Sequence, residues 1–233
     1  MIARPFEGAL ALITQPDHAH LARRVMERCV ALDGHPRRED ILHAVGEHDN
    51  GWAEPDAAPV IDPETGRLAD FVKLPLPARH GVWRRGVARL ASRPWVAALV
   101  AHHAVTVYDR FRADSDWNLF FAEMERAREA MIDASGRPAD DLAGDYVFVR
   151  LADLISLAFC TGSNERAAFD GWSLALDGDR VLIAPDMFDG AAIPLEVEAR
   201  EIPDRAWPDD DALRAAVAAA RPLTIRGEVA GQA

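Results

Sequence analysis

The stretch Glu47-His48-Asp49-Asn50-Gly51-Trp52 places a histidine and an aspartate side by side at the end of a predicted helix. Apolar residues at helical spacing precede it, from Ile41 to Val45, and predict a helix over residues 37–49. Gly51 supplies the expected C-terminal stop of that helix. Imidazole and carboxylate groups are common ligands of transition metals. His48 and Asp49 are therefore the first candidate ligands of a metal site.

A second candidate ligand, His18, lies near the N-terminus. Thr14-Gln15-Pro16-Asp17 is typical of a helix start, and the helix is expected to run to about Leu32. His18 falls on the apolar stripe of this helix, whereas His20 falls on its polar face. An inward histidine either forms a hydrogen bond within the core or binds a metal, and this segment alone leaves both alternatives open.

Asp153 is an anion within an otherwise apolar helix that is predicted over residues 145–160. Burial of an unpaired carboxylate is costly, so Asp153 needs a hydrogen-bond donor, a cation or a metal. Arg150 is one turn away and is one candidate partner. A metal shared with His48 and Asp49 is the other.

The interval between Asp49 and Asp153 contains further helices, predicted at residues 80–91, 94–111 and 117–135. His103 shares an apolar face with its helical neighbours, and His102 lies about a hundred degrees further round the helix. His80 begins the first of these helices. The Arg84-Arg85 pair on it either contacts phosphate oxygens or forms a solvated face.

Residues 53–77 are predicted to form a long loop, because prolines interrupt any regular element and Asp62-Pro63-Glu64-Thr65-Gly66 is a turn signature. A loop of this length is often a lid or a binding loop. The alternative is a structural loop that Trp52 and Phe71 fix to the core.

The two ends of the chain carry strand patterns. Extended segments are predicted within residues 1–13, in a hairpin over residues 172–184, and at residues 193–202 and 223–229, with a helix at 210–220. We therefore expect a mainly α fold with a small antiparallel β-sheet (α+β). It forms a single domain over residues 1–233, with a helical core at 14–162 and β-rich flanking parts at 1–13 and 170–233.

The composition restricts the partners. The 26 Lys and Arg residues against 38 Asp and Glu give a net charge of −12, which disfavours nucleic acids and anionic membranes. Two cysteines, Cys29 and Cys160, exclude a cysteine-rich zinc module and leave a single disulfide open. The N-terminus lacks the apolar core of a signal peptide and no segment is long enough to span a membrane, so a cytoplasmic location is expected. A homo-oligomer is compatible with this composition.

Two family resemblances follow from these residues. His18, His48-Asp49 and Asp153 resemble the H…HD…D order of the HD-domain superfamily of metal-dependent phosphohydrolases. Over nearly its full length, the chain resembles a bacterial family known as a numbered domain of unknown function. The stretches that carry this second resemblance are Ile13 to His18, Glu47 to Trp52, Asp62 to Gly66 and Leu151 to Cys160.

The HD resemblance implies an HD-like helical core with one divalent transition metal (Mn, Fe, Zn or Ni), bound by His18, His48, Asp49 and Asp153. It implies that metal-activated water attacks a small phosphoester or nucleotide. The residues expected to transfer protons are His103 and His80, and those expected to contact the substrate are Arg84, Arg85 and Trp52.

Three alternatives remain open from the sequence. The first is an HD-type di-iron oxygenase, in which Glu47 or His80 completes the site. The second is a non-catalytic module that binds a metal or a metabolite. The third is a metal-free structural protein, because a fold resemblance does not establish a function.

Overall fold

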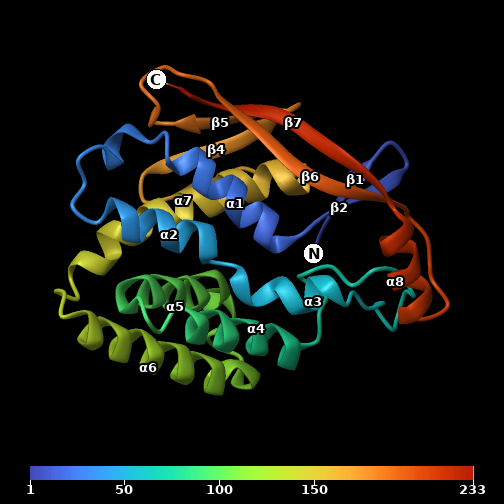
Figure 1. Cartoon of the computed structure of the whole chain (residues 1–233), viewed down its shortest axis with the longest axis horizontal. Coiled ribbons are helices and arrows are strands. Elements are labelled where there is room, and N and C mark those ends of the chain that lie inside the picture. The colour runs from blue at the N-terminus through green and yellow to red at the C-terminus, as the bar shows by residue number, and fades with distance from the viewer. Residues whose placement is uncertain (233) are drawn as a thin grey trace.

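Seven strands form one curved sheet over a stack of helices (Figure 1). The computed structural model describes residues 1–232. The strand order is β1-β2-β6-β7-β5-β4-β3, so the two ends of the chain build a common sheet. The strands are β1 (Ile2–Phe6), β2 (Ala9–Ile13), β3 (Ala167–Phe169), β4 (Trp172–Asp177), β5 (Arg180–Ala184), β6 (Ile193–Pro203) and β7 (Arg221–Gly231).

The sheet corrects the prediction of a small antiparallel one. Strand β7 enters between β6 and β5 after a helical connection, and it pairs with β6 antiparallel and with β5 parallel. The sheet is therefore mixed and seven-stranded, and the chain is an α+β protein. The strand segments predicted at both ends are confirmed, including the hairpin of β4 and β5. The order of the strands is a non-local property, which local patterns did not reveal.

The helices lie in layers beneath the sheet (Figure 1). Helices α1 and α7 pack against strands, α2 and α5 pack against α7, and α4 and α6 pack against α5. In the described chain, no helix combines the length and the apolar character that crossing a membrane requires. The helices are α1 (Gln15–Met26), α2 (Arg38–Glu47), α3 (Ala53–Ala57), α4 (Leu76–Arg89), α5 (Pro94–Tyr108), α6 (Asn118–Ser135), α7 (Asp141–Thr161) and α8 (Asp210–Ala219).

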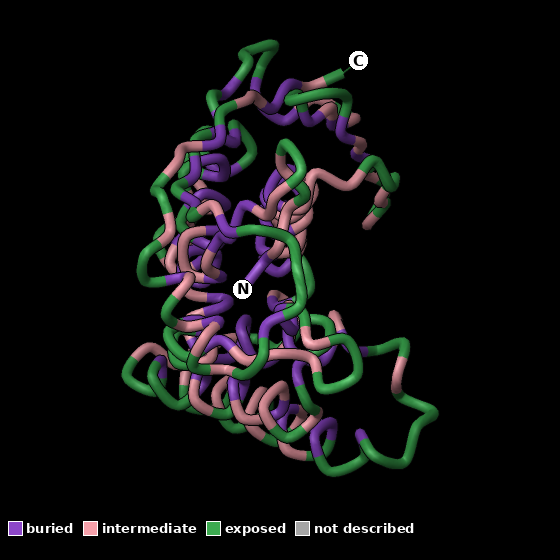
Figure 2. The backbone as a smooth tube through the Cα atoms, turned by 90° about the vertical axis from the view of Figure 1, so that its right-hand side faces the viewer, coloured by how far each residue is buried: buried purple, intermediate pink, exposed green. Residues whose placement is uncertain are grey.

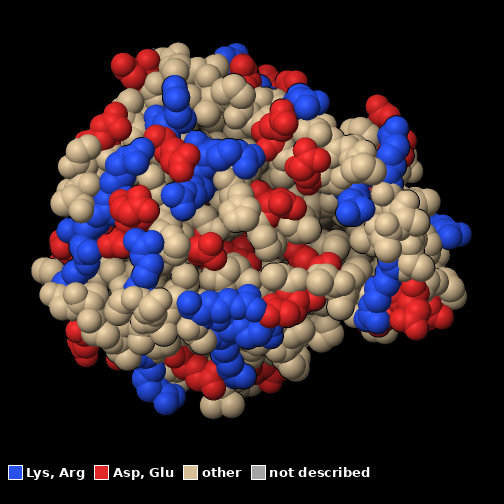
Figure 3. Space-filling view, in the orientation of Figure 1, with Lys and Arg blue, Asp and Glu red and all other residues tan. Residues whose placement is uncertain are grey.

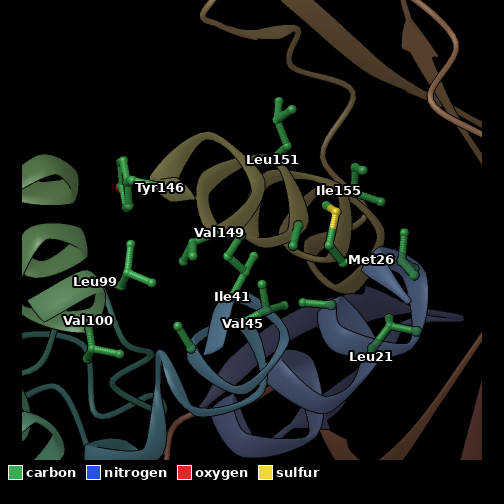
Figure 4. Close-up of a cluster of buried hydrophobic side chains, with 14 of the residues drawn as sticks. Leu21, Met26, Ile41, Val45, Leu99, Val100, Tyr146, Val149, Leu151 and Ile155 are labelled. Carbon is green, nitrogen blue, oxygen red and sulfur yellow. The ribbon is translucent and has the colours of Figure 1, made fainter. Parts of the chain in front are cut away.

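One large hydrophobic cluster joins the helices to the sheet. Figure 4 shows part of this cluster, to which α1 contributes Leu21, α2 Val45, α5 Leu99 and α7 Ile155. Buried segments occupy the interior and exposed segments form the peripheral loops (Figure 2). Helices α1, α2, α5 and α7 therefore have fixed positions relative to one another, which is the condition for a site built from all of them.

Two predicted helix boundaries are wrong. The first helix ends at Met26 rather than near Leu32. The backbone is extended at Cys29, so the helix does not continue through this residue, although the side chain of Cys29 is buried. Helix α4 begins at Leu76 rather than at His80, since Pro77 lies in its first turn, where a proline fits without loss of a helical hydrogen bond. The predicted loop at 53–77 also contains the short helix α3. The earlier start of α4 brings Arg79 into this helix.

Gly51 does not end helix α2 as predicted. It lies in a 3₁₀ turn, Asn50–Trp52, and a Cβ atom at this position would be 1.8 Å from the backbone oxygen of Val82 in α4. Glycine is therefore needed because two backbones approach each other closely. This contact places the middle of α4, at Val82 and Gly86, next to the turn that follows His48 and Asp49.

We expect Gly51→Ala to destabilise the protein by about 1–3 kcal/mol or more, because the added methyl group must displace backbone. Gly144→Ala is the matched control. Gly144 lies in α7 with open space around it, so this change should stabilise the protein by about 0.5–1 kcal/mol. Urea denaturation of both variants measures the difference, and equal stabilities would contradict the close packing at Gly51.

Candidate metal centre

Four helical segments bring buried histidines and aspartates together. Helix α1 supplies His18, the end of α2 supplies His48 and Asp49, α5 supplies His103, and α7 supplies Asp153. All five side chains are buried. Adjacent residues of a regular helix point about 100° apart. His48 and Asp49 can both face His18 because α2 ends at Glu47 and the backbone leaves helical geometry at Asp49.

The distances between the polar atoms are short. His18 Nε2 lies 3.2 Å from His48 Nε2, and 3.2 Å from an Asp153 carboxylate oxygen. The Asp49 carboxylate lies 3.8 Å from His18 Nε2 and 3.5 Å from His48 Nε2. His103 Nε2 joins the cluster from the other side, 3.8 Å from Asp153. The four predicted ligands therefore lie together, and His103 adjoins them.

In each of the three imidazoles, Nδ1 contacts a polar group, which fixes the orientation of the ring. His48 Nδ1 donates to the backbone oxygen of Val45 at 2.7 Å. His18 Nδ1 lies 2.9 Å from the Ser156 hydroxyl, which can donate in turn to the backbone oxygen of Asp153. His103 Nδ1 lies 3.1 Å from the Tyr146 hydroxyl. With Nδ1 as the donor in each contact, every Nε2 presents its lone pair to the cluster.

Burial and neighbouring charges act in opposite directions on these groups. Burial lowers the pKa of His48, but the Asp49 and Asp153 carboxylates outweigh it and raise that pKa to about 9. Burial raises the pKa of Asp49. Burial by itself would raise the pKa of Asp153, but its hydrogen bonds with His18 and His48 hold that pKa well below 3.8. Burial lowers the pKa of His103 well below 6.5, so this imidazole is neutral at neutral pH.

This donor set fits a divalent transition metal. Two ligand atoms bound at about 2.1 Å, at tetrahedral or octahedral angles, lie about 3.0–3.4 Å apart. The measured separations around His18 and His48 run from 3.2 to 3.8 Å. Two imidazole lone pairs that face each other also require a proton or a cation between them. Imidazole with carboxylate suits manganese, iron, zinc or nickel.

The cluster opens onto a cavity of about 360 Å³. His18, Asp49, His103 and Asp153 form part of its lining. The remaining wall is mostly aromatic, aliphatic and basic, and it also carries one amide and one carboxylate; its lining residues are Gln15, Trp52, Phe71, Val72, Arg79, Trp83, Val107, Tyr108, Arg110, Arg150, Leu157 and Glu165. A small molecule in this cavity would contact both the cluster and the arginines.

Three of the predicted site residues lie elsewhere. His80 packs against Trp117 and stacks on Phe120, outside the lining of the cavity. Arg84 is exposed and pairs with Glu123. Arg85 donates to the backbone oxygen of Gly51. The residues of α4 that line the cavity are Arg79 and Trp83.

Trp52, the third residue expected to contact the substrate, lines the cavity and packs edge-on against Phe71. Trp52 and Phe71 therefore fix the loop to the core, and the role of this segment as a binding loop stays a prediction. Arg150 pairs with Asp153, as one of the sequence alternatives proposed. One Asp153 oxygen thus contacts Arg150 and the other contacts His18, while the shared metal stays a prediction.

The sequence interpretation missed four residues that surround the cluster. Gln15 lies one turn before His18 on the same helix, and this spacing could have identified it. Arg79 was missed because α4 was expected to start after it. Ser156 and Tyr146 support the imidazoles from α7, and they had looked like ordinary residues of an apolar helix.

We expect Ser156→Ala to weaken metal binding by about 10–100-fold, because His18 would lose the partner that orients its ring. The exposed Ser92 is the control, and Ser92→Ala should leave the affinity unchanged. Competition against a chelator measures both dissociation constants. An unchanged affinity of the Ser156 variant would show that the hydroxyl does not support a metal ligand.

Comparison with known protein families gives one match. The model of a family described as a protein of unknown function, DUF3891, matches residues 1–204, which include the whole cluster. Helix α8 and strand β7 follow the matched region. Searches of curated proteins and of solved structures gave no match. The chain belongs to the DUF3891 family of proteins of unknown function.

Proposed function

We propose that this protein is a metal-dependent hydrolase that acts on a small phosphoester or nucleotide. The observation that carries the proposal is that a buried cluster of histidine and aspartate opens onto a cavity that arginines also line. The cluster provides metal ligands and the arginines provide charge for phosphate oxygens. A cavity of about 360 Å³ is suited to a small molecule.

The proposed metal ligands are His18, His48, Asp49 and Asp153, on α1, α7 and the turn after α2. A divalent metal held there would lower the pKa of a water and polarise a phosphoryl oxygen. The H…HD…D order along the chain, which resembles HD-domain phosphohydrolases, supports the same assignment. Manganese, iron, zinc and nickel all fit the donor set.

His103 is the proposed proton-transfer residue. Its imidazole is neutral because burial lowers its pKa, so Nε2 can accept a proton at neutral pH. The contact of Nδ1 with the Tyr146 hydroxyl fixes the orientation of the ring. His103 lines the cavity, which gives Nε2 access to a bound molecule.

Arg79 and Arg110 are the proposed contacts for phosphate oxygens, in place of Arg84 and Arg85. Both line the cavity. Within the described part of the chain, neither forms an ion pair, whereas Arg84 and Arg85 have acidic neighbours. An arginine without a carboxylate partner retains its full capacity to bind an oxyanion.

The di-iron oxygenase alternative receives less support. It relied on Glu47 or His80 to complete a second metal position. Neither residue lines the cavity or belongs to the groups of potential ligands found among the described residues. A module that binds a metal or a metabolite without turnover has the same ligands, and the experiment below distinguishes it from a hydrolase.

We expect the protein loaded with manganese, iron, zinc or nickel to hydrolyse model phosphomonoesters or phosphodiesters. His103→Gln should retain its metal content and lose about 10²–10⁴-fold in turnover, because the proton acceptor is removed. His20→Gln is the control, since His20 is exposed on the far face of α1. Absence of turnover by loaded wild-type protein on every phosphoester would contradict the hydrolase and favour the binding module.

A further inference from the structure

Several residues that line the cavity carry buried polar atoms that have no hydrogen-bond partner. Within residues 1–232, these include the side-chain oxygen of Gln15, the indole N–H of Trp52 and the Nε–H of Arg79. All three residues line the cavity beside the metal cluster. Folded proteins pair nearly all of their buried polar groups, so a local group of unpaired ones indicates a missing partner.

The chemistry of the unpaired atoms defines that partner. The indole of Trp52 and the guanidinium of Arg79 can only donate hydrogen bonds, so they require acceptors. Gln15 contributes an acceptor oxygen, which requires a donor. A ligand with acceptor oxygens at one end and a hydroxyl or N–H group elsewhere satisfies all three.

Arg79 differs from the other arginines of α4 in its charge environment. Arg84 pairs with Glu123, and both Arg85 and Arg89 pair with Glu54. Among the described residues, Arg79 has no carboxylate partner, and its guanidinium lies over the ring of Trp117 at 5.4 Å. Acidic and basic side chains are interspersed on the face seen in Figure 3, in a chain of net charge −12. Because Arg79 has no carboxylate partner within residues 1–232, its guanidinium is available to bind an anion from outside the protein.

Part of the cavity wall is apolar. Phe71, Val107, Tyr108 and Leu157 line the same cavity. Such a surface favours a ligand whose body is aromatic or aliphatic rather than a bare inorganic ion.

We infer that Arg79 and Trp52 form a subsite for an anionic group that binds without the metal, and that the substrate is a small organic anion with an apolar or aromatic body. Gln15 accepts a hydrogen bond from a hydroxyl or N–H group of the same molecule. The anionic group is a phosphate or a carboxylate. This inference rests on the proposed function in taking the cavity to be the substrate site.

Calorimetric titration of the full, chelator-treated protein tests the subsite. The probes are phenyl phosphate, benzoate and the neutral benzyl alcohol. We expect the anions to bind and the alcohol not to bind. Arg79→Gln should weaken anion binding by about tenfold or more, and Trp52→Phe by about threefold or more, since each removes donors. Arg84→Gln, on the same helix but outside the cavity, should change it by less than about twofold.

The relative affinities identify the anionic group. Tighter binding of phenyl phosphate assigns the subsite to a phosphate, and tighter binding of benzoate assigns it to a carboxylate. Unchanged anion affinity in Arg79→Gln would overturn the subsite, as would equal binding of benzyl alcohol. If Arg79→Gln does not fold, the same comparison of anion and alcohol with Trp52→Phe decides the question.

The subsite and the hydrolase can fail separately. Anion binding to metal-free protein, with no turnover after metal loading, would retain the subsite and remove the hydrolase. Turnover by the metal-loaded protein, with no Arg79-dependent binding in the metal-free protein, would support the hydrolase and overturn the subsite.

Discussion

Burial of the Asp153 carboxylate is the constraint on which the arrangement of the helices depends. A buried anion is costly unless cations or donors surround it. Here His18 and His48 approach one of its oxygens and Arg150 approaches the other. Helix α1 and the end of α2 must therefore lie against α7 in one orientation. The shared hydrophobic cluster stabilises that packing, and the buried polar contacts determine its register.

Contacts between neighbouring segments position the metal cluster and the cavity relative to each other. The close approach at Gly51 places α4 against the turn that carries Asp49, so Arg79 and Trp52 lie at the cavity into which that turn opens. The support for the histidines comes from the other side, where Ser156 and Tyr146 of α7 hold His18 and His103. Residues that could hold a metal and the proposed substrate contacts thus line one cavity.

Local rules predicted the cluster but not its surroundings. Asp153 and His18 could be identified because charged or polar groups on apolar helix faces need partners, and helical spacing shows the faces. His80 was a candidate because it lies in the interval between Asp49 and Asp153, and that position could not show that it faces the aromatic residues Trp117 and Phe120 rather than the cluster. Arg79 depended on a helix start that Pro75 and Pro77 obscured. The mixed sheet depended on strand order, which spacing does not determine.

Metal content is the most direct test of the central claim. Protein purified without an affinity histidine tag should contain near-stoichiometric manganese, iron, zinc or nickel by mass spectrometry. Asp49→Ala should lose that metal because a carboxylate beside His18 and His48 is removed. Asp133→Ala, which changes an exposed aspartate of α6, should retain it. An equally low content in wild type and in Asp49→Ala, persisting after incubation with each metal, would contradict the site.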